Sequence, residues 1–129
     1  MELYTQYKNF ANEVFQELGV GYSERVYHNA MEVILRTNGI SYETERIVPI
    51  VFDNHTIGNL RADLIVNNEI ILELKAVKTI NSLMKKQAEN YLKLTGLKNA
   101  LVINFPQSDN AIECEIVEVT LKEGEEVQE

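Results

Sequence analysis

Apolar residues recur along the chain with two different spacings, and these predict helices and strands in a definite order. Spacings of three and four residues over 3–18 and 23–37 predict two amphipathic helices, separated by a Gly-Val-Gly sequence. Ser23 is placed to cap the second helix, and Gly39 is placed to end it because glycine tolerates positive φ. The first third of the chain is therefore expected to be helical.

The remainder of the chain is predicted to form five strands and one further helix. A third helix is expected to begin after a cap at Asn81 or Ser82 and to run to Thr95, with Gly96 as its C-terminal stop. The predicted order is ααβββαββ, an α/β domain around one mixed sheet. Strands are predicted over residues 42–52, 56–66, 69–77, 100–105 and 112–121.

Charged residues interrupt the hairpin predicted around Asn67-Asn68. Period-2 alternation places Glu73 and Lys75 on one face of its second strand. A three-residue loop, 67–69, would set Asp63 directly opposite Glu73, with Cβ atoms roughly 4.5–5.5 Å apart. A two-residue loop would leave the carboxylates diagonal. We expect the three-residue loop.

Opposed carboxylates are destabilising unless a positive charge lies between them. A divalent cation fills this role, because Mg²⁺ favours one or two carboxylates together with water and substrate phosphates. The alternative is that Asp63 and Glu73 are solvated and that Lys75 pairs with a surface acid. The three residues together, beside a β-branched run that requires burial, favour a functional site.

Two predicted helices carry further polar residues on apolar faces. Glu24 opens the second helix and shares a face with its apolar residues, so it is expected to point inward, although an acid there also complements the helix dipole. Gln87 and Tyr91 lie four residues apart on the apolar face of the third helix. A buried Gln needs hydrogen-bond partners, or it costs about 1–3 kcal/mol.

Composition limits the class of protein. The 129 residues are 45% hydrophobic and 25% charged, which is ordinary for one globular domain, expected over 1–122. Residues 123–129 carry four acids and no base, and are expected to form an acidic flexible tail. The net charge of −8 argues against a general nucleic-acid binder. Residues 75–98 nevertheless carry six lysines against one acid.

Features of targeting are missing from the sequence. No apolar run approaches the roughly 20 residues that span a bilayer, so no membrane partner is expected. The N-terminus lacks the basic region and apolar core of a secretory signal. Cys114 is the single cysteine, consistent with a reducing compartment, and only two histidines accompany it, without the spacing of a zinc site. A cytoplasmic location is expected.

The pattern Asp63 … Glu73-x-Lys75 resembles the signature of the PD-(D/E)XK nuclease superfamily, with Ala62 where that name has Pro. Gln87-Ala-Glu-Asn-Tyr91 is similar to the Q-x-x-x-Y element of its RecB-like and lambda-exonuclease-like branches. Residues 21–27, Gly-Tyr-Ser-Glu-Arg-Val-Tyr, resemble the G-x-x-E-x-x-Y element of a small single-domain family. The resemblance implies a restriction-endonuclease-like core, αβββαβ, with an extra N-terminal helix and C-terminal strand.

The resemblance also implies a metal site and its ligands. Asp63, Glu73 and the backbone carbonyl of Leu74 would bind Mg²⁺ or Mn²⁺, because hard cations prefer oxygen donors. Glu24 would complete the acidic cluster or hold a second metal ion. The metal would polarise the scissile phosphate and lower the pKa of a bound water.

The other residues of the implied site act on substrate and water. Lys75 would orient the attacking water or stabilise charge on the phosphate. Gln87 and Tyr91 would position Lys75, water or a phosphate. Tyr27 would be packing support, and Arg61 could contact a phosphate.

Three functions are weighed against these residues. The first is a metal-dependent nuclease that hydrolyses DNA phosphodiester bonds, alone, as a homodimer or with a larger protein partner. The second is a non-catalytic or partner-dependent nucleic-acid-binding or assembly module on the same fold, which the acidic net charge favours. A small-molecule hydrolase with paired carboxylates lacks support, because Lys75 beside the pair fits phosphate chemistry better.

Overall fold

The computed structural model describes residues 2–108 and 110–119. The predicted order and type of the elements are confirmed, while the end of the last predicted strand and the acidic tail lie outside the described residues. None of the described helices is long and apolar enough to cross a membrane. The elements are α1 (Glu2–Leu18), α2 (Glu24–Thr37), β1 (Tyr42–Phe52), β2 (His55–Val66), β3 (Ile70–Lys75), α3 (Ser82–Thr95), β4 (Asn99–Asn104) and β5 (Glu113–Glu118).

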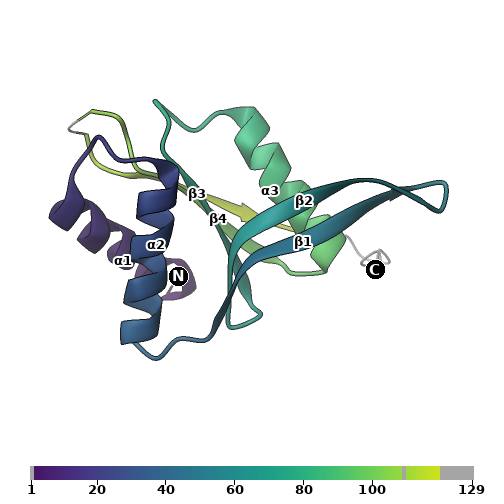
Figure 1. Ribbon diagram of the computed structural model, residues 1–129, viewed down its shortest axis with the longest axis horizontal. Helices are drawn as coiled ribbons and strands as arrows, with labels where there is room; N and C mark the ends of the chain where they lie inside the picture. The colour runs from purple at the N-terminus through teal and green to yellow at the C-terminus, as the bar shows by residue number, and fades with distance from the viewer. Residues whose placement is uncertain (1, 109, 120–129) are drawn as a thin grey trace.

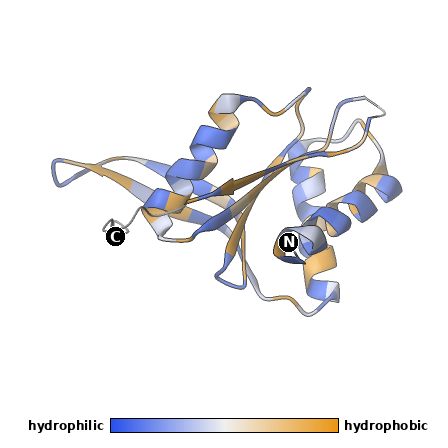
Figure 2. Ribbon diagram, turned by 180° about the vertical axis from the view of Figure 1, so that it is seen from behind, coloured by the Kyte–Doolittle hydropathy of each residue, from blue (hydrophilic) through white to orange (hydrophobic). Residues whose placement is uncertain are grey.

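The strands form one sheet in the order β1-β2-β3-β4-β5, in which only β3 and β4 are parallel. Helices α1 and α2 cover one face of the sheet and α3 covers the other (Figure 1). Each face buries its own apolar cluster, and Figure 2 shows the central strands hydrophobic between more hydrophilic helices. The fold is thus the expected α/β domain with a mixed sheet flanked by helices.

The predicted helix ends have local causes in the sequence. At the start of α3, the Asn81 side chain accepts a hydrogen bond from the Met84 N–H at 2.9 Å, which selects Asn81 as the cap. Gly96 ends the helix with φ of 78°. Gly39 follows α2 with φ of 68°, a conformation that residues with a side chain rarely adopt.

The register of the β2–β3 hairpin is the expected one. Val66 pairs with Ile70 and Leu64 with Leu72, so three residues form the loop. Asn67 and Asn68 have φ values of 53° and 52°, which Asn tolerates better than most residues. The alternative two-residue loop is excluded.

Strand β2 leaves the sheet at Asp63. Its pairing with β3 stops at Leu64, and the rest of β2 continues with β1 as a two-stranded arm that projects from the domain (Figure 1). Leu64 packs in the cluster under α1 and α2, whereas Ala62 packs in the cluster under α3, so β2 turns over between them. Asp63 therefore lies where two strands diverge.

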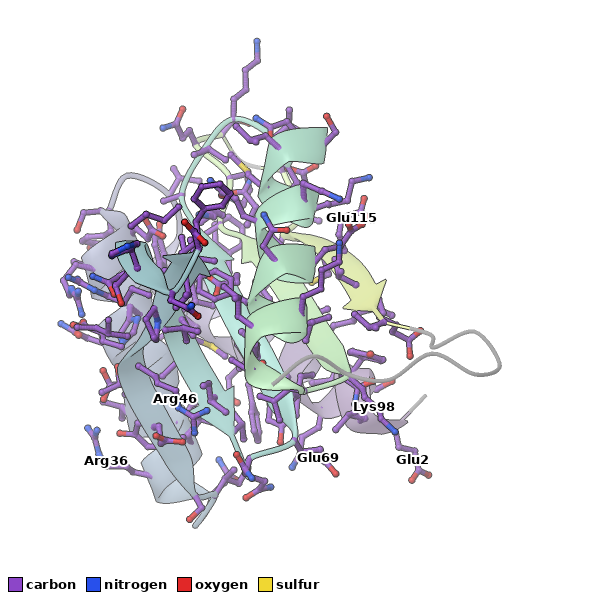
Figure 3. All side chains as sticks on the ribbon, turned by 90° about the vertical axis from the view of Figure 1, so that its right-hand side faces the viewer. Glu2, Arg36, Arg46, Glu69, Lys98 and Glu115 are labelled. Carbon is purple, nitrogen blue, oxygen red and sulfur yellow. The ribbon has the colours of Figure 1, made fainter. Side chains whose placement is uncertain are left out.

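The parallel strands β3 and β4 begin at one end of the sheet and finish at the other. Glu69, ahead of β3, and Lys98, ahead of β4, project at the same end in Figure 3. The loops that follow β3 and β4 meet the α1–α2 loop at the opposite end (Figure 1). This second end is where Lys75 closes β3.

Candidate active site

Two carboxylates meet where β2 and β3 diverge. Extending the register from Leu64 and Leu72 by one residue sets Asp63 opposite Glu73. Glu73 is 5% exposed, and its Oε1 has no hydrogen-bond partner within the described part of the chain. Burial, followed by the charge and hydrogen bond of Asp63, raises the pKa of Glu73 well above its usual value. The pair is therefore held together at an electrostatic cost.

The backbone of Leu74 takes part in the same site. Asp63 Oδ2 accepts a hydrogen bond from the Leu74 N–H at 2.8 Å, in the position that a ladder partner from β2 would have occupied. The Lys75 carbonyl faces β4, where it accepts from the Phe105 N–H at 2.9 Å. Because peptide groups alternate along a strand, the Leu74 carbonyl is directed toward β2 and Asp63.

Lys75 follows on the same side of β3 as Glu73. Its side chain is half-buried, and within the described ranges no carboxylate lies within ion-pair distance of its ammonium. None of the described acids therefore serves as the surface partner that the alternative assigned to Lys75. The ammonium is left available for a ligand.

Glu24 is exposed, so the expectation that it points inward is wrong. It is the first residue of α2, whose buried face starts only at Tyr27. Partial desolvation and then the charge of Asp63 raise the pKa of Glu24, while Lys75 lowers it. Glu24 thus stands at the rim of the site, within the electrostatic field of Asp63 and Lys75.

Gln87 is also exposed and makes no hydrogen bond in the described structure, so its predicted inward orientation is wrong. The buried stripe of α3 is formed by Ala88, Tyr91 and Leu92, and Gln87 lies beside this stripe. Tyr91 is buried as expected, and its hydroxyl donates to the Arg61 carbonyl. Burial and then the charge of Glu73 raise the Tyr91 pKa, which puts its ring near the carboxylates.

A buried histidine of α2, considered from the sequence only as a candidate zinc ligand, supports the site. His28 is 4% exposed, and its Nε2 lies 2.9 Å from both Thr44 Oγ1 and Glu32 Oε2. The Thr44 hydroxyl donates to the Asp63 carbonyl at 3.3 Å. The position of His28 beside Tyr27 on an amphipathic helix was the available signal, but Thr44, which links it to Asp63, lies in another element.

Glu45 is a second residue that the sequence did not reveal. It lies between Thr44 and Arg46, which pair with Leu64 and Ala62, and therefore beside Asp63. Its φ of 56° is uncommon outside glycine. Its carboxylate lies 2.5 Å from Arg25 and 3.8 Å from Arg61, and hydrogen bonding by Arg25 lowers its pKa. Arg61 is thus tied to β1 at the rim of the site.

A hydrogen-bond network that the sequence did not reveal fixes the loop that follows Lys75. Asn104 is fully buried; it accepts from the Val77 N–H and donates to the Val77 carbonyl and to Glu113, each at 2.9 Å. Glu113 also accepts from the Thr79 hydroxyl at 2.7 Å and from the Ile80 N–H at 3.2 Å. Hydrogen bonds from Asn104 and then Thr79 lower the Glu113 pKa. The network joins β4 and β5 to the segment between Lys75 and α3.

The donor set can be tested against a metal ion. Among the described residues, no three His, Cys, Asp or Glu side chains are grouped closely enough to hold one. Asp63, Glu73 and the Leu74 carbonyl provide oxygen donors from two side chains and one peptide group. Mg²⁺ and Mn²⁺ suit such a set, because Mg²⁺ commonly keeps several water ligands. The unpartnered Glu73 Oε1 is the atom that a cation would satisfy, so the residues fit.

Comparisons with known proteins identify the family and the fold. The sequence matches the model of the PD-(D/E)XK nuclease superfamily over residues 1–117. Among solved structures, one described as the crystal structure of SSO0001 superposes with a TM-score of 0.58 at 24% identity. The match covers 78% of this chain and 52% of that one, so the chain spans about half of its length. The search of curated proteins finds no match.

Proposed function

The chain belongs to the PD-(D/E)XK nuclease superfamily, and we propose that it is a metal-dependent nuclease that hydrolyses phosphodiester bonds of DNA. One observation carries the proposal: Glu73 is buried against Asp63 with an oxygen that has no partner among the described residues. A buried acid of purely structural role would be expected to have its oxygens satisfied. A divalent cation between the carboxylates accounts for both the burial and the missing partner.

Mg²⁺ or Mn²⁺ is the proposed cofactor, held by Asp63, Glu73 and the Leu74 carbonyl. When bound, it would polarise the scissile phosphate and acidify a water ligand. Glu24 at the rim would bind through a water molecule or help to hold a second ion. Its raised pKa, caused in part by the charge of Asp63, supports a shared electrostatic environment.

The remaining residues act on water, substrate and backbone. Lys75, free of ion pairs in the described structure, donates to the attacking water or to a phosphate oxygen, where it stabilises developing charge. Tyr91 holds the β2 backbone two residues before Asp63 and so positions this carboxylate. Gln87, exposed beside the buried stripe of α3, is free to contact a phosphate or a water.

The small single-domain G-x-x-E-x-x-Y branch is the proposed subfamily. Gly21 has φ of 99°, which explains a glycine there. The Tyr27 ring stacks on the Phe105 ring with the two centroids 4.4 Å apart, and the Tyr27 hydroxyl donates to the Gly19 carbonyl at 2.6 Å. The backbone conformation of Gly21 and the contacts of Tyr27 explain why these two motif residues are needed for the fold. Glu24 is the motif residue that is proposed to act in the site. The domain is proposed over 1–122, in line with the family match.

A non-catalytic or partner-dependent module is the second candidate, because the net charge of −8 opposes the approach of DNA. A homodimer or a larger protein partner would supply additional contacts to DNA. A cytoplasmic location is proposed on the single cysteine.

The test is a cleavage assay with end-labelled single- and double-stranded DNA and RNA, each with Mn²⁺, with Mg²⁺ and with chelator. We expect metal-dependent products from DNA that disappear in Asp63→Ala. A clean preparation that is inactive on every substrate, while binding metal normally, would favour the partner-dependent module.

A further inference from the structure

Three loops gather at the end of the sheet where Lys75 lies. They are residues 19–23 between α1 and α2, residues 76–81 after β3, and residues 105–108 after β4 (Figure 1). In open α/β sheets, ligands bind outside the carboxyl ends of parallel strands, and β3 and β4 are the parallel pair of this sheet. The surface formed by these loops is therefore the expected approach for substrate.

An aromatic ring stands on this surface. Tyr22 is 49% exposed and packs edge to face on Tyr27, with ring centroids 6.1 Å apart and an interplanar angle of 82°. Tyr27 is stacked on Phe105 with an interplanar angle of 2°, and the Phe105 N–H donates to the Lys75 carbonyl at 2.9 Å. A continuous line of contacts thus connects Tyr22 with the end of β3 at the site.

Tyr22 is also connected with the site through the short stretch of chain that leads to Glu24. Tyr22 precedes Glu24 by two residues, a path of at most about 7 Å. The carboxyl group of Glu24 lies in the field of Asp63 and Lys75. Tyr22 therefore lies beside Glu24, at the rim of the site that carries the proposed chemistry.

The loop that carries Tyr22 is open on its outer side. Gly19 and Gly21 have φ values of 72° and 99°, and apart from the adjoining residues of the chain no atom lies within 4 Å of the position that a Cβ would take at either residue. The Tyr22 hydroxyl makes no hydrogen bond in the described part of the chain. The ring is therefore supported from Tyr27 and remains accessible to a ligand.

We infer that Tyr22 stacks against a nucleobase next to the scissile phosphate. The inference rests on the proposed nuclease function and specifies its substrate. In a duplex, both faces of a base are covered by its neighbours, so an aromatic platform requires an unpaired base. The substrate class is thus a single strand or a frayed end, with one base on Tyr22 and its phosphate between Lys75 and the carboxylates.

The test measures binding of a fluorescent single-stranded oligodeoxynucleotide and of an abasic strand of equal length and charge. Ca²⁺, which also binds oxygen ligands, is the metal, and gels verify that the strands stay intact. Tyr22→Ala should weaken binding of the normal strand about 5- to 100-fold. Binding of the abasic strand, which offers phosphates alone, should not change, and Tyr22→Phe should bind both strands like wild type.

Phe52 provides the matched control. It is 69% exposed at the end of β1, on the projecting arm, so Phe52→Ala removes an even more accessible ring away from the site. Phe52→Ala should bind both strands like wild type. Tyr22→Leu keeps apolar contact with Tyr27 without an aromatic face, and replaces Tyr22→Ala if that variant unfolds.

Wild-type affinity of Tyr22→Ala and Tyr22→Leu for the normal strand, or an equal loss on both strands, would overturn the inference. If hydrolysis by wild type persists in those cases, the nuclease function stands without the stacking site. If the base-dependent loss appears but wild type hydrolyses no strand with any metal, the stacking site stands and the nuclease function fails.

Discussion

Replacement of Glu73 by Gln tests whether the role of this buried acid is to bind a cation. In metal-free protein, Glu73 must either face Asp63 as a second anion or hold a proton at a pH where water would remove it. The substituted glutamine side chain would carry no charge and could donate to Asp63 from its amide. We therefore expect Glu73→Gln to stabilise the metal-free protein at neutral pH.

The size of this effect follows from the burial of the group. Holding a proton on a carboxyl with an unfolded pKa of 4.5 costs about 1.36 kcal/mol per pH unit, at most about 3.4 kcal/mol at pH 7. Relief of an unsatisfied buried group typically contributes about 1–3 kcal/mol. We expect a gain of about 1–3 kcal/mol, or roughly 3–5 °C in Tm per kcal/mol.

The pH dependence has a definite sign. Because the folded pKa of Glu73 is raised, its contribution to stability is fully present below pH 4.5 and is lost as pH rises through the folded value. The difference between Glu73→Gln and wild type should therefore be small near pH 4 and should grow toward pH 7. Saturating Mn²⁺ should offset most or all of it, since wild type gains about 2.7 kcal/mol at 100 times Kd and the variant gains little.

Urea denaturation at several pH values, with chelator and with Mn²⁺, measures each of these differences. Asp63→Asn is the matched control, because it also removes one charge of the pair. The reasoning would be refuted if Glu73→Gln were less stable than wild type at pH 7 in chelator. It would also be refuted if the stability of wild type did not change with Mn²⁺.

Other residues give separate outcomes. Lys75→Ala should lower the cleavage rate and leave Mn²⁺ affinity nearly unchanged, because Lys75 is no metal ligand; a parallel loss of affinity in calorimetry would contradict its role. Gln87→Ala should reduce the rate less than Lys75→Ala, and an equal or larger loss would argue against an auxiliary role. Asn104→Leu removes three hydrogen bonds that hold the loop after Lys75 and should destabilise the protein by about 2–5 kcal/mol in urea, against nearly zero if the network is incidental. Tyr91→Phe should cost about 1 kcal/mol and weaken Mn²⁺ binding, whereas unchanged binding would assign the hydroxyl to stability alone.

Local signals explain why the fold could be predicted from the sequence. The Asn81 cap, the glycine stops and the alternation of the strands depend on neighbouring residues, and each appears in the expected place. Ser23 occupies the N-cap position of α2, but its side chain makes no capping hydrogen bond. The placement of Asp63 opposite Glu73 was also predicted, because Asn67-Asn68 marked the turn; the choice between a two- and a three-residue loop was decided only by the pairing of Val66 with Ile70 in the structure. The Leu74 carbonyl was expected as a ligand only from the resemblance to the nuclease superfamily.

The orientations that failed depend on where helices end relative to the sheet. Spacing put Glu24 and Gln87 on apolar faces, but one position along a helix turns a side chain by about 100°. Glu24 also lies beyond the buried part of α2. Spacing within a helix carries no information on either point.

The supporting networks could not be found because their partners are distant in sequence. Thr44 reaches Asp63 across 19 residues, and Asn104 reaches Val77 across 27. Each residue alone is an ordinary polar residue in a strand. Only the paired strands bring them together around the site.

Calorimetric titration of Mn²⁺ into wild type, Asp63→Asn and Glu73→Gln tests the central claim most directly. The account predicts saturable binding by wild type and loss of that binding in both variants, each of which remains folded. If both variants bind Mn²⁺ with wild-type affinity, the opposed carboxylates do not hold the metal ion and the proposed active site is contradicted.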